Sequence, residues 1–136
     1  MRLVKKKYFK VNGGILMKIT KDMVHKSYLY AKKVYKNDIT RSEGKIEITR
    51  ATGMNSGSAG DYITVFLAMM SGDEYRRTIN TYATDYYLQN IKVDFGQEAF
   101  IKALSAVEQH VRYYNKLGRG NLKSIQDVVK EYKELL

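Results

Sequence analysis

Four small polar residues in a row, Asn55-Ser56-Gly57-Ser58, are the strongest candidates for binding chemistry in this chain. They stand at the start of a predicted helix, where an amide, two hydroxyls and free backbone N–H groups favour phosphate and can reach base edges. The alternative is simple helix capping, which needs only Asn55 or Ser56. We predict Asn55, Ser56 and Ser58 as groove contacts to DNA. The following segment, 56–70, contains no lysine or arginine, so phosphate neutralisation must come from elsewhere.

Cationic side chains that could neutralise phosphates lie in two nearby segments. One is the helix predicted just before Asn55, and the other is a polar loop, residues 75–80, that follows the next helix. Arginine binds phosphate through paired hydrogen bonds, and lysine binds it as a point charge. The alternative is ion pairing with acidic residues of the same region. The predicted phosphate contacts are Arg41, Lys45, Arg50, Arg76 and Arg77.

Histidine and cysteine usage gives no support to catalysis. His25 and His110 are the only histidines, and neither has a carboxylate or second histidine at metal-ligand spacing, so we expect both at the surface or at the edge of the core. The sequence has no cysteine, phosphate-binding loop, nucleophile elbow or zinc motif. We therefore expect no enzyme activity, no metal and no cofactor.

Capping signals define the elements that position the candidate residues. Thr40 and Glu43 form a reciprocal capping box at the start of a helix over 41–52, and Gly53 supplies a left-handed residue at its end. Asn55 then caps the next helix, so about three residues join the two. This is the spacing of a helix-turn-helix, which makes nucleic acid the first partner to consider.

The rest of the chain also shows apolar residues at helical spacing. Further helices are predicted over 21–36, 56–70, 81–94 and 97–117, and Asn121 opens a last one. No segment beyond residues 7–11 alternates with period two, and there is no proline. The predicted fold class is all-α, a compact bundle of five to six helices with a helix-turn-helix-like unit, in a single domain over residues 17–136.

Apolar and aromatic stripes indicate which helix faces are buried. The stripe of the last helix is expected to end with Leu135. Tyrosines are abundant, and most of them, including Tyr82, Tyr86 and Tyr87, are expected at the edge of the core with hydroxyls in water. A platform for stacking bases and a protein interface are the alternatives. The stripe of the helix over 97–117 consists of Phe100, Ala103, Leu104, Val107, Val111 and Tyr114.

The formal charge of +10 suggests an anionic partner, but half of it lies in residues 1–16. This tail is either a basic nucleic-acid arm or a translated upstream leader, because Gly13-Gly14-Ile15-Leu16 before Met17 is what a purine-rich ribosome-binding run would encode in frame. Both interpretations stay open. No signal peptide or membrane-spanning run is present, so we expect a cytoplasmic protein with no membrane association. The cations of the tail are Arg2, Lys5, Lys6, Lys7 and Lys10.

Three short motifs show a family resemblance. They are Gly53-Met54-Asn55-x-Gly57-Ser58-Ala59-x-Asp61-Tyr62-Ile63, Tyr75-x-Arg77-Thr78-Ile79-Asn80 and Ala83-Thr84-x-Tyr86-Tyr87-Leu88. Over residues 18–136 the chain resembles a helical domain found in the N-terminal part of some bacterial HNH restriction-type endonucleases. The resemblance implies a DNA-binding or specificity module. The nuclease histidines and asparagine of the HNH motif are absent from this sequence, so the resemblance implies targeting without cleavage.

Two functions follow from these observations. The first is a non-catalytic domain that binds double-stranded DNA, as a small regulator or a detached targeting module. The alternative is a small phage- or mobile-element-encoded inhibitor that binds a host protein through a tyrosine and arginine surface. A DNA-binding domain should carry the cationic residues on one face with the helix end at 55–58. Cationic residues scattered over the surface would favour the inhibitor.

Overall fold

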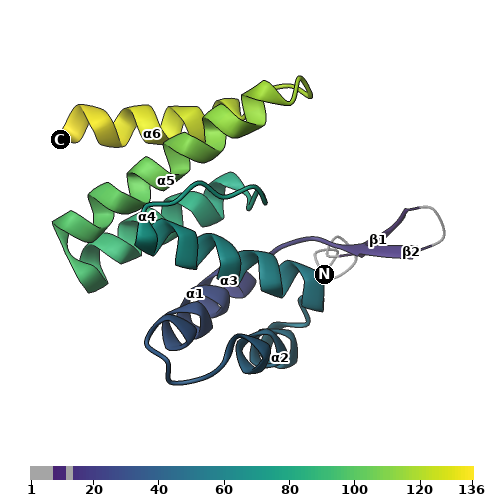
Figure 1. The fold of residues 1–136 in the computed structure, drawn as a ribbon. Helices are drawn as coiled ribbons and strands as arrows, with labels where there is room; N and C mark the ends of the chain where they lie inside the picture. Colours follow the sequence, from purple (N-terminus) through teal and green to yellow (C-terminus); the bar gives the residue numbers. More distant parts are fainter. Residues whose placement is uncertain (1–7, 12–13) are drawn as a thin grey trace.

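Six helices and an N-terminal β-hairpin make up the described part of the chain, residues 8–11 and 14–136 of the computed structural model (Figure 1). The predicted all-α bundle of five to six helices is confirmed. The helices are α1 (Lys21–Tyr35), α2 (Arg41–Thr52), α3 (Ser56–Ser71), α4 (Thr81–Phe95), α5 (Gln97–Lys116) and α6 (Lys123–Leu135).

The hairpin is an element that the sequence analysis did not predict, although its first strand falls in residues 7–11, the one segment with period-two alternation. Strands β1 (Tyr8–Val11) and β2 (Gly14–Met17) pair antiparallel, with Tyr8 opposite Met17, and extend away from the helices (Figure 1). The strand β2 therefore crosses the predicted boundary between the tail and the domain. Neither interpretation of the tail is tested, because most of its cations lie outside the described residues. These are Arg2, Lys5, Lys6 and Lys7.

The caps around α2 and α3 form as predicted. Thr40 Oγ1 accepts from the Glu43 backbone N–H at 3.1 Å, and Glu43 Oε1 accepts from the Thr40 N–H at 2.8 Å. Gly53 is left-handed, with φ of 82°. Asn55 Oδ1 accepts from the Ser58 N–H at 2.8 Å. These local bonds satisfy backbone groups that a helix end leaves free, so they fix where α2 ends and α3 begins.

Gly44 explains how α2 packs against two helices at once. A methyl group at this position would lie 2.7 Å from Val34 Cγ2 on α1 and 3.2 Å from Ile63 Cδ1 on α3. A glycine in a helix interior weakens the helix by about 1 kcal/mol relative to alanine. Here its missing side chain makes the close packing possible.

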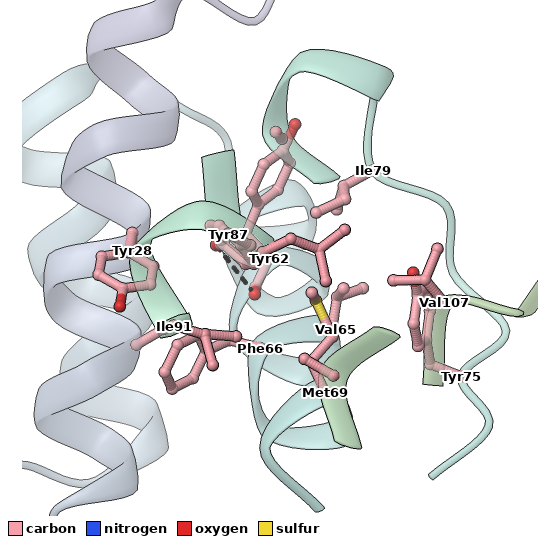
Figure 2. Close-up of a cluster of buried hydrophobic side chains, with 14 of the residues drawn as sticks. Tyr28, Tyr62, Val65, Phe66, Met69, Tyr75, Ile79, Tyr87, Ile91 and Val107 are labelled. Atoms are coloured by element: carbon pink, nitrogen blue, oxygen red, sulfur yellow. Dashed lines mark hydrogen bonds between the residues drawn. The ribbon is translucent and has the colours of Figure 1, made fainter. Parts of the chain in front are cut away.

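The helices form two sets of three that meet at α3. The first set is α1, α2 and α3, the second is α4, α5 and α6, and α3 also packs on α5 while α1 packs on α4. The core lies at this junction, where Phe66 of α3 and Tyr87 of α4 are fully buried (Figure 2). The Tyr87 hydroxyl donates to the Tyr62 carbonyl at 3.2 Å, shown as the dashed line in Figure 2. The helix α3 is therefore the central helix of the bundle.

In the second half of the chain, the predicted apolar stripe of α5 is confirmed, whereas the predicted start of α6 and the predicted burial of Leu135 are wrong. The stripe of α5 is buried from Phe100 to Val111. The start of α6 was placed one residue early, because the helix is capped by Leu122 and not by Asn121. Leu135 is 82% exposed, since it lies at the last turn of α6, where the helix ends in solvent.

Candidate nucleic-acid interface

The described part of α3 is open to a partner at its two ends, and the N-terminal turn holds the candidate residues. Ser56 and Gly57 are exposed, and Ser58 is half-buried. Asn55 is exposed, and its side-chain oxygen is occupied by the capping bond from the Ser58 N–H. From Ala59 onward α3 is buried or half-buried until its last residue. A partner therefore meets the end of α3 and not its side.

A groove of about 310 Å³ lies beside this turn, and three helices begin around it. Ser58 belongs to the first turn of α3, Asn80 is the N-cap of α4, and Ile19 precedes Thr20, the N-cap of α1. The positive end of each helix dipole thus points toward the same region. We call this the helix-end groove. Its lining is Ile19, Ser58, Asp61, Tyr62, Thr78, Ile79 and Asn80.

Arg41 and Lys45 lie directly on α3 next to this turn. Arg41 Nη2 donates to the Gly60 carbonyl at 3.1 Å. A methyl group at Gly60 would lie 3.4 Å from both Arg41 Nη2 and Lys45 Cε, so the glycine leaves room for both cationic side chains. The sequence analysis did not identify Gly60, although it belongs to the same run of small residues that begins at Ser56.

Arg77 approaches the same turn from the loop between α3 and α4. Its Nε lies 3.6 Å from Asp61 Oδ1, and Asp61 lines the helix-end groove. Both side chains of this pair are more than one third exposed, so the ion pair contributes little to stability. An incoming phosphate can therefore compete for the guanidinium, although Asp61 opposes an anion placed at the groove itself.

Arg76 and Arg50 are not brought to the helix-end groove. Arg76 Nε lies 3.5 Å from Glu74 Oε1, and its guanidinium lies over the Tyr113 ring of α5, 5.0 Å from the centroid. Arg50 pairs with Glu47 at 2.9 Å. At about 100° per residue, Arg50 points about 180° away from Arg41 around α2. The structure therefore gathers three of the five predicted cations and separates two.

His110 corrects the expectation that both histidines lie at the surface or the core edge. It is fully buried, and its Nδ1 lies 2.6 Å from the Tyr75 carbonyl oxygen. A carbonyl only accepts, so Nδ1 carries the proton and Nε2 accepts from the Thr78 hydroxyl at 2.9 Å. Burial lowers the His110 pKa, although the Tyr75 carbonyl and Glu74 act in the opposite direction.

These two hydrogen bonds hold the loop over residues 73–80 on α5. Because Arg77 lies between Tyr75 and Thr78 in the chain, His110 fixes the backbone that presents this arginine. No sequence pattern indicates this role, since the partners of His110 lie more than thirty residues earlier.

Residues 8–11 and 14–136 offer no group of three or more histidine, cysteine or acidic side chains placed to hold a metal ion. Over the same described residues, every helix is too short or too polar to span a bilayer.

Comparison with known proteins finds no similarity: no family model, no curated protein and no solved structure matches this chain. The resemblance to the HNH-type domain therefore stays a prediction from its motifs.

Proposed function

We propose that this protein is a non-catalytic, cytoplasmic domain that binds double-stranded DNA through the helix-end groove and the cations beside it. The observation that supports this most is the meeting of the α1, α3 and α4 N-terminal ends next to Arg41, Lys45 and Arg77. Backbone N–H groups and helix dipoles attract phosphate at such ends, and the side-chain cations add charge that a duplex backbone requires.

In this proposal the residues have different roles. Arg41, Lys45 and Arg77 contact phosphates, and the exposed Asn55 and Ser56 reach base edges from the first turn of α3. Ser58 has a smaller part, because it is half-buried and its backbone N–H is used by the cap. The amide nitrogen of Asn55 makes no hydrogen bond to the residues that the structure describes, and an amide N–H suits an acceptor on a base edge.

The buried flank of α3 limits the mode of binding. A helix that lies along the major groove needs an exposed side, whereas residues 59–70 of α3 are buried or half-buried. End-on docking brings few side chains to the bases, so most of the affinity comes from phosphates and falls steeply with salt. A targeting module or regulator of modest sequence preference fits this geometry, and the HNH-type resemblance agrees with it.

The test is the salt dependence of duplex binding, measured by fluorescence anisotropy. Lys45→Gln and Arg77→Gln should each weaken binding to every sequence and reduce the slope of log K against log salt by about 1. Arg50→Gln is the matched control, because it removes one charge of the same sign from the opposite side of α2. We expect it to keep the parent slope. An equal effect of all three variants would refute the helix-end groove as the binding surface.

A second function, binding to a protein, is favoured by the far side of α2. A groove of about 440 Å³ between α1 and α2 includes Ile46, whose side chain is 54% exposed, together with Tyr30 and Arg50. Exposed apolar groups with a charged rim suit a protein interface. Absence of binding to long duplex at low salt would favour this function over DNA binding.

A further inference from the structure

Three aromatic rings from α1 and α4 form a stack on the surface. His25 of α1 stacks on Tyr86 of α4, with centroids 4.3 Å apart and planes 20° apart. Tyr82, one turn earlier on α4, is inclined 25° to Tyr86 at 6.1 Å. His25 Nε2 lies 2.6 Å from the Tyr82 hydroxyl. We call these three residues the aromatic platform.

The aromatic platform is open to solvent, unlike the tyrosines of the core. His25 is exposed and Tyr82 is 38% exposed, whereas Tyr28 and Tyr87 beside them are buried. The hydrogen bond and the stack restrain the three rings before any partner binds. A restrained flat surface loses little conformational entropy when it takes up a flat ligand.

The aromatic platform and the helix-end groove share the N-terminal turn of α4. Tyr82 follows Asn80 by two residues, and Asn80 lines that groove. Lys21, in the first turn of α1, follows the groove residue Ile19 by two and places its Nζ over the Tyr82 ring, 5.3 Å from the centroid. A cation from the first turn of α1 thus lies on the Tyr82 ring of the aromatic platform.

We propose that the aromatic platform binds an unpaired base of a nucleic acid whose neighbouring phosphates lie at the helix-end groove. The inference rests on the proposed function and specifies its substrate as a duplex with an adjoining single-stranded segment. Bases within an intact duplex have both faces covered by their neighbours, so only an unpaired base can present a face to Tyr82. Stacking on tyrosine and histidine is tolerant of sequence, and Lys21 neutralises the adjacent phosphate.

The test compares a blunt duplex with the same duplex carrying a short single-stranded overhang, both measured by fluorescence anisotropy with the full chain. The overhang should improve the affinity about tenfold, in the range that one stacked base gives. Tyr82→Leu keeps apolar volume but loses the flat ring, so it should remove this preference and leave binding to the blunt duplex unchanged. Tyr82→Phe is the matched control and should keep the preference.

A second measurement does not depend on how the variants fold. A 5-iodouracil placed in the overhang should cross-link, under long-wavelength ultraviolet light, to the peptide that contains Tyr82 or to the one that contains His25. Adducts confined to other peptides would overturn the inference.

The outcomes separate the two proposals. Equal affinity for blunt and overhang duplex would overturn the aromatic platform and leave the DNA-binding function intact. A third probe is the overhang strand alone. If the protein binds this single strand with adducts at Tyr82 but does not bind the blunt duplex, the aromatic platform is supported and duplex binding is refuted. Absence of binding to any of the three probes would refute both. A preference for the overhang that survives Tyr82→Leu would also count against the aromatic platform.

Discussion

Each of the two histidines in the described chain stacks on a tyrosine with the same separation of ring centroids, in opposite surroundings. His25 and Tyr86 are 4.3 Å apart at 20°, and His110 and Tyr75 are 4.3 Å apart at 16°. The first pair lies at the surface between α1 and α4, and the second is buried between α5 and the loop before α4. The stacking geometry is therefore not what distinguishes their roles.

The hydrogen-bond partners of His25 and His110 distinguish the roles of the two rings. His110 uses both ring nitrogens inside the protein, on Tyr75 and Thr78. His25 makes one hydrogen bond to an exposed side chain, the Tyr82 hydroxyl. A ring with both nitrogens and both faces enclosed stabilises the fold, whereas a restrained ring at the surface remains available to a ligand. This contrast leads to two measurable differences, and a third and smaller one concerns two buried tyrosine hydroxyls.

Removal of the two rings should have very different effects on stability. His110→Ala leaves a cavity and a buried carbonyl of Tyr75 without its donor, so we expect it to lower the free energy of unfolding by about 2–4 kcal/mol. His25→Ala removes surface contacts only, and its effect should stay within about 1 kcal/mol. Urea denaturation of both variants measures the difference. Equal losses would show that the surface stack is also structural.

The pH dependence of stability should reveal the buried histidine. Burial lowers the His110 pKa in the folded protein. Above about pH 6.5, the ordinary value for histidine, the ring is neutral in both folded and unfolded chains. As the pH falls below that value, the unfolded chain takes up a proton that the folded chain resists, so the free energy of unfolding decreases until the folded pKa is reached.

His110→Gln supplies the comparison for this effect. The variant has no titrating group at this position, so its free energy of unfolding should change less over the same pH range than that of the parent. Chemical denaturation at several pH values between neutral and mildly acidic conditions measures both curves. Parallel curves would contradict the assignment of His110 as a buried, neutral group.

The contrast between the two histidines also shows what the sequence can predict. Thr40, Glu43, Gly53 and Asn55 act on backbone groups within four residues of themselves, so both ends of α2 and the start of α3 were predicted correctly. The burial of His110 depends on Tyr75 and Thr78, and nothing in the spacing around His110 reports their presence.

The residues of the candidate site also differ in how far the sequence could predict them. The small residues at the start of α3 could be found from the chain, because a helix end is a local feature. The approach of Arg41 and Lys45 to Gly60 requires that α2 pack across α3, and the meeting of three helix ends requires the whole bundle. Helical spacing already places Arg50 on the other side of α2 from Arg41. Which of these sides faces α3, and where Arg76 lies, depend on how the helices pack.

The smallest expected effect distinguishes two buried tyrosine hydroxyls. The Tyr75 hydroxyl is buried and has no hydrogen-bond partner among the described residues, whereas the Tyr87 hydroxyl donates to the Tyr62 carbonyl. An unsatisfied buried hydroxyl is unfavourable, so Tyr75→Phe should raise the free energy of unfolding by about 0.5–2 kcal/mol and keep the stack on His110. Tyr87→Phe should lower it by about 0.5–1.5 kcal/mol, because a satisfied bond is lost. Urea denaturation at neutral pH measures both. A loss of stability in Tyr75→Phe equal to that in Tyr87→Phe would mean that a bound water satisfies the Tyr75 hydroxyl, and the interior around His110 would then be wet.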